Sequence, residues 1–183
     1  MLSAPLRTRF SLSLRLDYYE PEHLQQIVQR SADILNVEIE PEGAFEIARR
    51  SRGTPRIANN LLRWTRDYAQ VKAKGIVNKE TAASALSMLD IDDCGLDEMD
   101  KRILETILVR FRGGPVGLNS LSVAIGEEAD TIEDVYEPYL IQEGYMMRTA
   151  QGRIATEKAW SMFGLTPRGK RSRGAPSDTP DLL

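Results

Sequence analysis

An arginine follows a glycine-containing turn in the segment Ser51–Leu62, which reads SRGTPRIANNLL. Pro55 suits the first position of a helix, where its missing N–H costs nothing, and Thr54 can cap that helix. Arg56 would then lie in the first helical turn, beside free backbone N–H groups that favour an anion. Because a cation there opposes the helix dipole, we expect Arg56 either to bind a phosphate or to pair with a surface carboxylate such as Glu46.

The composition is that of an ordinary globular protein. The chain has 183 residues, of which 42% are hydrophobic and 28% charged, enough for one or two small domains. No apolar run reaches the length of a membrane span, and the first residues lack the pattern of a signal peptide, so we expect a cytoplasmic protein with no membrane partner. Cys94 and His23 are the single cysteine and the single histidine. This excludes an intrachain disulfide and a Cys/His metal cluster.

The net charge of −3 conceals a division along the chain. Lys/Arg and Asp/Glu number 13 and 10 in residues 1–89, 7 and 15 in residues 90–164, and 4 and 2 in residues 165–183. The acidic string DIDDCGLD at residues 90–97 predicts a join between two domains, because like charges beside a glycine do not form a core. The composition from Thr166 onward predicts a disordered basic tail over residues 166–183.

The first of these domains shows one strand pattern and four helix patterns. Polar and apolar residues alternate over Ser11–Asp17, which predicts a half-buried strand. Apolar spacing and prolines predict helices from Pro21, from about Pro41, from Pro55 to about Val71, and near residues 79–89. Trp64 and Tyr68 lie four residues apart in the third helix, and we expect both in the core.

The second domain combines three helices with a hairpin. Helices are predicted over residues 96–112, ending at a Gly-Gly-Pro sequence, over 118–125, closed by Gly126, and over 127–143, where Pro138 should kink or restart the helix. Residues 145–149 and 153–156 should pair through a short connection in which Gly152 can adopt a positive φ. This order is typical of a winged helix, whose third helix usually enters the major groove of DNA.

The charges of this domain oppose a conventional recognition helix. The third helix is strongly acidic, and phosphate repulsion would oppose its insertion into a groove. Its acidic residues are Glu127, Glu128, Asp130, Glu133, Asp134, Glu137 and Glu143. Arg148 and Arg153 lie on the two arms of the hairpin, where they could contact phosphates without reading bases. The alternative is two solvated arginines that discourage edge pairing.

Several of these strings together resemble the RuvB family, AAA+ ATPases that drive branch migration of Holliday junctions. GTPRIAN, followed by LLR and RD, resembles the sensor 2 segment of that family. The match runs in the family's order from about residue 2 to residue 167. Its other strings are PLRTRF at residues 5–10, GGPVGL at 113–118, YEPYL at 136–140 and GR at 152–153.

The resemblance implies a mainly α fold with an AAA+ helical lid, the small ATPase domain, followed by a winged-helix DNA-binding domain. The end of the large ATPase domain would occupy residues 1–19, the lid 20–90, the winged helix 91–165 and the tail 166–183. Arg9 would be an arginine finger that reaches the γ-phosphate in the neighbouring subunit. Tyr19 would contact ATP, and Arg56 would report the nucleotide state. A surface salt bridge for Arg9 and a packed strand end for Tyr19 are the structural alternatives.

The same resemblance implies partners and a DNA interface. Arg148 and Arg153 match the family's DNA-contacting wing arginines. Ala150 and Gln151 replace a proline and an arginine of that wing, and Ala129 stands where some members have another arginine. We therefore expect weaker DNA contact per subunit, which a hexameric ring could recover by avidity. The implied cofactor is ATP with Mg²⁺, and the implied partners are four-way junction and duplex DNA, RuvA, and RuvC in the resolvasome.

Phosphate-binding motifs of an ATPase are missing from the sequence. No G-x-x-x-x-G-K-[ST] loop occurs, and no Walker B carboxylates precede the lid. We therefore expect that the chain resembles a carboxyl-terminal portion, that Mg²⁺ and most phosphate ligands come from an upstream domain, and that this chain alone does not hydrolyse ATP. The competing hypothesis is a winged-helix adaptor or regulator that binds protein through its acidic helix. Such a regulator would need neither Arg9 nor Arg56.

Overall fold

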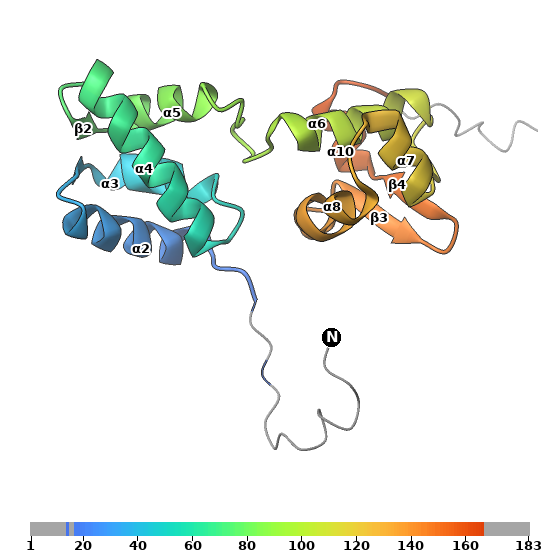
Figure 1. The fold of residues 1–183 in the computed structure, drawn as a ribbon, viewed down its shortest axis with the longest axis horizontal. Helices are drawn as coiled ribbons and strands as arrows, with labels where there is room; N and C mark the ends of the chain where they lie inside the picture. Colours follow the sequence, from blue (N-terminus) through green and yellow to red (C-terminus); the bar gives the residue numbers. More distant parts are fainter. Residues whose placement is uncertain (1–13, 15–16, 167–183) are drawn as a thin grey trace, which may run out of the picture. The chain divides into compact units, whose positions relative to one another are not determined.

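The chain folds into two mainly helical units, which confirms the predicted fold class (Figure 1). A computed structural model describes Leu14 and residues 17–166. The two units divide between Gly95 and Leu96. The tail predicted over residues 166–183 lies outside the described residues except for Thr166. The predicted strand over Ser11–Asp17 lies outside them except for Leu14 and Asp17, and neither of these two residues is in a strand.

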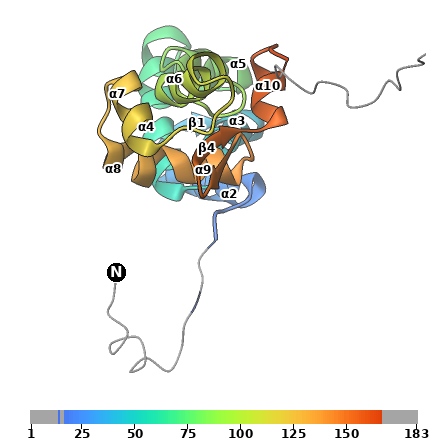
Figure 2. The same ribbon diagram turned by 90° about the vertical axis from the view of Figure 1, so that its right-hand side faces the viewer.

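In the described part of the first unit there are four helices, as predicted. They are α2 (Pro21–Ile34), α3 (Pro41–Arg49), α4 (Pro55–Lys72) and α5 (Lys79–Ser87). The first three begin with a proline, which is pre-organised for the first helical turn. The fourth begins after Asn78, whose side chain accepts a hydrogen bond from the N–H of Thr81 at 2.9 Å. The described chain enters this unit through residues 17–20, which lead into α2 (Figures 1 and 2).

Two short strands, one after α2 and one after α4, pair with each other in this unit. β1 (Glu38–Ile39) pairs in parallel with β2 (Ile76–Val77), and neither was predicted because two residues give no alternating pattern. Gly43 of α3 packs closely on this pair, since a Cβ there would lie 2.4 Å from the carbonyl oxygen of Val77. The core of the first unit contains buried apolar side chains from all four helices, among them Leu24, Ile47, Leu62 and Leu86.

Trp64 and Tyr68 do not lie in the core, so that prediction was wrong. Trp64 is 37% exposed, and Tyr68 is only partly buried. The Nε1 atom of Trp64 donates a hydrogen bond to the carbonyl oxygen of Ala85 at 2.8 Å. Because a packed indole N–H needs an acceptor, this bond holds the ring at the edge between α4 and α5.

The acidic string belongs to the first unit up to Gly95, whereas we placed the domain boundary at residue 90. Arg50 donates to the carbonyl oxygen of Ile91 at 3.0 Å and to Oδ1 of Asp93 at 2.6 Å. Ile91 also packs against the first core. Leu96 is fully buried in the second core. Arginine side chains thus bind the acidic string to the first unit, and the charge pattern of the string alone does not predict this contact.

Helices also dominate the second unit, with a hairpin near its end. Its helical elements are α6 (Glu98–Glu105), the π-helical segment Thr106–Arg110, α7 (Leu118–Ile125), α8 (Ala129–Thr131), the π-helical segment Ile132–Tyr136, α9 (Glu137–Gln142) and α10 (Glu157–Met162). Asp97 and Asp100 form a capping box at the start of α6. α7 ends at Gly126, which has a φ of 80° as a left-handed cap. The predicted third helix is interrupted by a π-helical turn just before Pro138, which lacks the backbone N–H of a regular helix.

The predicted hairpin is confirmed. β3 (Met146–Thr149) pairs antiparallel with β4 (Gly152–Ala155), and Arg148 lies directly opposite Arg153. Val116 adds an isolated bridge to the outer side of β4, through the N–H of Arg153 and the carbonyl oxygen of Val116 at 2.8 Å. Gly152 is required there, because its φ is 131° and a Cβ would lie 2.3 Å from that carbonyl oxygen. α10, which was not predicted, follows β4 and packs beside it.

Candidate nucleotide and DNA sites

Tyr19 lies against the turn that precedes α4. Its backbone N–H donates a hydrogen bond to the carbonyl oxygen of Gly53 at 2.9 Å. Gly53 has a φ of 64°, and a Cβ there would lie 2.6 Å from the Cβ of Tyr18. The glycine therefore allows the two tyrosines to approach the turn closely. The fold brings together Tyr19 and the start of α4, which lie far apart in the sequence.

A small open hollow lies at this contact. Its volume is about 210 Å³, and its lining residues are Asp17, Tyr18, Tyr19, Gly53, Thr54 and Pro55. Thr54 precedes α4, but its hydroxyl donates to the carbonyl oxygen of Arg52 at 3.1 Å and does not cap the helix, contrary to our expectation. The first N–H groups of α4 therefore have no side-chain cap. Tyr19 is 49% exposed beside them.

Arg56 lies in the first turn of α4 with its side chain exposed. Among the residues that the structure describes, it forms no hydrogen bond or ion pair. The alternative partner, Glu46, is only 2% exposed and accepts hydrogen bonds from Nε of Arg49 at 2.7 Å and Nη2 of Arg50 at 2.5 Å. Pairing of Arg56 with Glu46 was therefore a wrong expectation. Arg9, the third residue assigned to ATP, lies outside the described residues.

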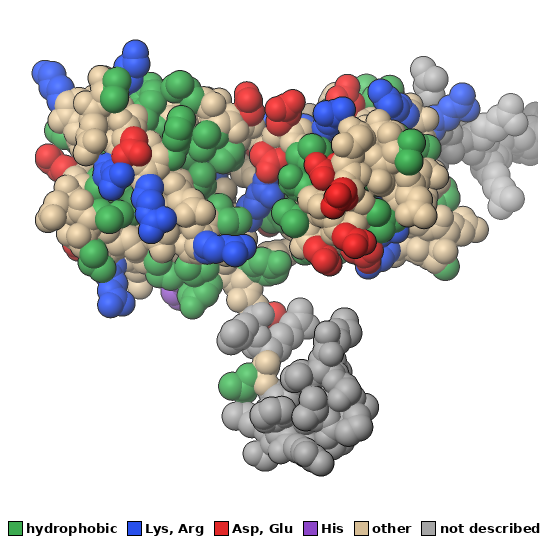
Figure 3. All heavy atoms as spheres, in the orientation of Figure 1, with side chains coloured by type: hydrophobic (Ala, Val, Ile, Leu, Met, Phe, Trp, Pro, Cys, Tyr) green, Lys and Arg blue, Asp and Glu red, His purple; other side chains and the backbone are tan. Residues whose placement is uncertain are grey.

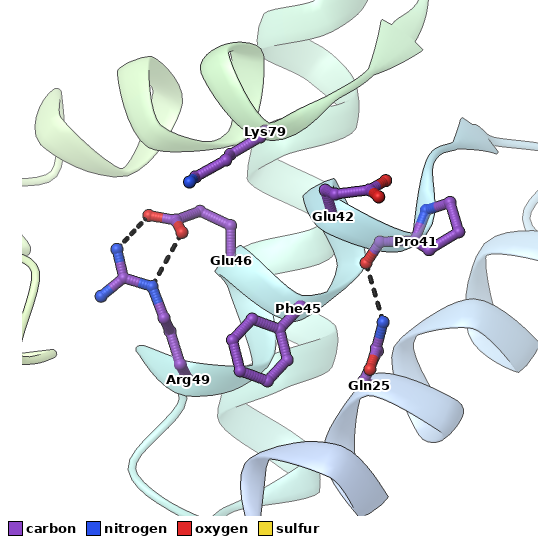
Figure 4. Close-up of a pocket in the computed structure, with 7 residues that line it drawn as sticks. All are labelled: Gln25, Pro41, Glu42, Phe45, Glu46, Arg49 and Lys79. Atoms are coloured by element: carbon purple, nitrogen blue, oxygen red, sulfur yellow. Dashed lines mark hydrogen bonds and ion pairs between the residues drawn. The ribbon is translucent and has the colours of Figure 1, made fainter.

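Glu46 has its own role in the first unit. Burial raises the pKa of its carboxyl group, but hydrogen bonds from Arg49 and Arg50 outweigh burial and leave the pKa below its ordinary value. Figure 4 shows Arg49 and Lys79 near the carboxylate of Glu46, with the ring of Phe45 farther along a pocket of about 510 Å³ on α3. The sequence contained a signal for this cluster, because Arg49 and Arg50 follow Glu46 at helical spacings of three and four residues.

The two wing arginines, Arg148 and Arg153, both bind carboxylates. Arg153 donates from Nε to Oε1 of Glu137 at 2.5 Å, and Arg148 donates from Nη2 to Oε2 of the same residue. Nη1 of Arg148 also lies 2.9 Å from Oε1 of Glu133. The side chain of Arg148 is 45% exposed and that of Arg153 only 11%. The alternative hypothesis, that both arginines are solvated, is therefore wrong.

Glu133 and Glu137 are the site residues that our sequence analysis missed. Glu137 was counted among the acidic surface of the third helix, but its side chain is fully buried. Hydrogen bonding to Glu137 raises the pKa of Arg148 above its ordinary value. The four-residue spacing of Glu133 and Glu137 could have indicated one helix face turned toward the hairpin arginines.

Acidic side chains gather on the surface around α8 (Figure 3). The exposed acidic residues of this segment include Glu128, Asp130 and Asp134. This face would repel DNA phosphates, as the sequence predicted. Within the described part of the chain, no three His, Cys, Asp or Glu side chains gather as a metal site requires, and no helix is long and apolar enough to cross a membrane.

Comparisons with known proteins assign both units. Residues 19–92 match the family model of the RuvB AAA lid domain, and residues 93–164 match that of the RuvB C-terminal winged helix domain. The chain is similar to a solved structure of *Thermotoga maritima* RuvB, described as a Holliday junction branch migration motor, at 48% identity and a TM-score of 0.84. A single-residue variant of that RuvB matches at 49% identity with the same TM-score.

Each of these matches covers 90% of this chain and 55% of the *Thermotoga* chain. This chain thus spans about half the length of the proteins it resembles. Two adjacent family domains in the RuvB order, together with this level of identity, leave no ambiguity about ancestry. The chain belongs to the RuvB family and comprises its AAA lid and C-terminal winged-helix domains.

Proposed function

We propose that this chain provides the nucleotide-sensing lid and the DNA-contacting winged helix of an ATP-driven motor for branch migration of Holliday junctions. Family membership supports the reaction class, because the similar *Thermotoga* protein is described as such a motor. The observation that carries the proposal is the start of α4, where Arg56 is exposed without a described partner. The half-exposed Tyr19 is bound through its backbone to the turn that precedes this helix.

The start of α4 fits the edge of a nucleotide. Uncapped N–H groups and a cation favour phosphate, and Tyr19 offers an aromatic surface beside them. Arg56 would bind the γ-phosphate and so couple the position of the lid to the nucleotide state. ATP with Mg²⁺ would supply the phosphoanhydride bond whose hydrolysis drives the motor. Arg9 would act across the subunit boundary of a hexameric ring, where it stabilises charge on the phosphoryl group.

The hairpin is the proposed DNA contact. The side chain of Arg148 is 45% exposed, whereas that of Arg153 is mostly covered and mainly orients the wing. Arg148 would therefore make the direct phosphate contact, and Arg153 would support it. Duplex and four-way junction DNA are the proposed ligands, and RuvA and RuvC are proposed partners of the full motor.

DNA binding by this chain tests the proposal directly. Fluorescence anisotropy would compare labelled four-way junction and duplex DNA at several salt concentrations. We expect Arg148→Ala to weaken binding to both and to reduce the slope of log affinity against log salt by about 1, as loss of one phosphate contact does. Arg102→Ala, which removes an exposed charge from α6, is the control. Wild-type protein that binds no DNA at low salt would favour the adaptor hypothesis.

A further inference from the structure

The two carboxylates bound to the wing arginines differ in their contact with solvent. The side chain of Glu137 is 0% exposed, and both arginines bind it. The side chain of Glu133 is 39% exposed. It lies 2.9 Å from Nη1 of Arg148 and 3.9 Å from Nη2 of Arg153. Glu133 therefore binds the outer side of this cluster, where solvent reaches it.

This difference decides which carboxylate a DNA phosphate can replace. Displacing Glu137 would leave a buried charge without its partners, which is strongly unfavourable. Displacing Glu133 would only transfer a carboxylate from one exposed arginine to water, and such exposed pairs contribute little. A phosphate that approaches Arg148 would therefore exchange with Glu133 and leave the bonds to Glu137 in place.

Charge neutralisation follows from the same geometry. The two arginines carry two positive charges, and Glu133 and Glu137 carry two negative charges within the same cluster. The wing thus has no surplus positive charge until one carboxylate leaves. Phosphate binding depends on such a surplus, because each neutralised phosphate releases condensed counterions.

We propose that Glu133 competes with DNA phosphate for Arg148 and thereby holds the DNA affinity of the wing below the value its arginines would otherwise give. Glu137 positions Arg148 and Arg153, while Glu133 occupies the donor that faces solvent. This inference rests on the proposed function, because it assumes that Arg148 contacts DNA. Each DNA contact then includes the release of Glu133, which weakens the contact and shortens its lifetime.

The test compares Glu133→Gln with Asp134→Asn. Both variants remove one negative charge from adjacent positions, but Asp134 is exposed and has no described contact with the arginines. We expect Glu133→Gln to tighten duplex binding about fivefold by anisotropy at fixed salt, and Asp134→Asn by less than about twofold. Glu133→Ala, which removes the contact altogether, should tighten binding at least as much. A matching near-UV circular dichroism spectrum would show that each variant is folded.

Combination with Arg148→Ala separates this inference from the proposed function. We expect most of the gain from Glu133→Gln to disappear when Arg148 is absent, because the exposed arginine that Glu133 binds at 2.9 Å is then gone and Arg153 is mostly covered. If Arg148→Ala weakens binding but Glu133→Gln behaves like Asp134→Asn, competition is refuted and the DNA contact stands. If Arg148→Ala leaves binding unchanged, or wild-type protein does not bind DNA, the proposed DNA contact fails and the inference fails with it.

Discussion

Nε of Arg153 lies 2.5 Å from Oε1 of Glu137, and this fully buried carboxylate ties β4 of the hairpin to α9. Each residue depends strongly on the other. Without Arg153 the buried Glu137 would keep only Arg148, and without Glu137 the mostly covered Arg153 would keep only Glu133, 3.9 Å from its Nη2 atom. The orientation of the wing therefore depends on an ion pair inside the domain as well as on the hairpin itself.

Glu137→Gln should destabilise the second unit. It removes the charge but keeps the shape, so we expect the free energy of unfolding to fall by about 3 kcal/mol. Glu133→Gln, at the solvent-facing carboxylate, should cost less than about 1 kcal/mol. Urea unfolding in a Trp64→Phe background would measure both, because Trp160 is then the single tryptophan. Equal unfolding midpoints for the two variants would contradict this account.

Arg50→Met should destabilise the first unit. Arg50 is 3% exposed, and its guanidinium binds Glu46, the carbonyl oxygen of Ile91 and Asp93. We expect a loss of about 2 to 4 kcal/mol, because three acceptors each lose a donor and the buried Glu46 keeps only Arg49. Arg63→Met, an exposed position with one hydrogen bond to Asn60 at 3.3 Å, is the control and should change stability by less than about 0.5 kcal/mol. Trp64 fluorescence in a Trp160→Phe background reports on this unit, and a similar small change for both variants would refute the role of Arg50.

Glu46 should make the first unit sensitive to acid. Its folded pKa is below the ordinary value of 4.5, so the folded state binds fewer protons than the unfolded state as pH falls through that range. The stabilisation is present above the ordinary pKa and is lost as pH falls through the lower, folded value. We expect urea midpoints to fall more steeply below pH 4.5 in wild type than in Glu46→Gln, which cannot titrate. Parallel pH profiles for the two proteins would contradict the pKa shift.

Gly53→Ala should impair nucleotide binding. The added Cβ would lie 2.6 Å from the Cβ of Tyr18, which would push the segment carrying Tyr19 away from α4. Gly75→Ala is a matched control, because Gly75 also has a positive φ, of 87°, but a Cβ there meets nothing within 4 Å. Both variants place an alanine at a positive φ, which destabilises the backbone, but only Gly53→Ala disturbs the hollow. The affinity for a fluorescent ATP analogue would be measured in a complex with a RuvB domain that carries the phosphate-binding loop. We expect only Gly53→Ala to weaken this affinity. Equal affinities for the two variants would show that the hollow does not contact the nucleotide.

Local sequence patterns predicted most of the helices. Pro21, Pro41 and Pro55 each begin a helix, since proline fixes φ and lacks an N–H that the first turn does not need. Gly152 similarly helped to predict the hairpin, although it begins β4 and does not lie in the connection. The parallel pair β1 and β2 was beyond such reasoning, because two-residue strands have no periodicity of their own and form only when α2 to α5 bring them together.

Pairing between distant elements limited the prediction of the site. Arg148 and Arg153 were recognised as a pair, but their carboxylate partners belong to another element and were assigned to the surface. The bond from Tyr19 to Gly53 likewise joins segments that the sequence separates. Charge and periodicity show which residues can ionise and which face is apolar, whereas the choice of ion-pair partner depends on tertiary packing.

ATP hydrolysis by a reassembled motor would show whether this lid senses the nucleotide. The chain would be mixed with a RuvB portion that carries the phosphate-binding loop, and DNA-stimulated hydrolysis measured for wild type, Arg56→Ala and Arg9→Ala. Arg63→Ala, which removes another exposed arginine of α4, is the matched control. We predict activity with wild type and Arg63→Ala, and its loss with Arg56→Ala and Arg9→Ala. Portions that associate but show no activity, or activity that Arg56→Ala leaves equal to Arg63→Ala, would contradict the assignment of this lid as the nucleotide sensor.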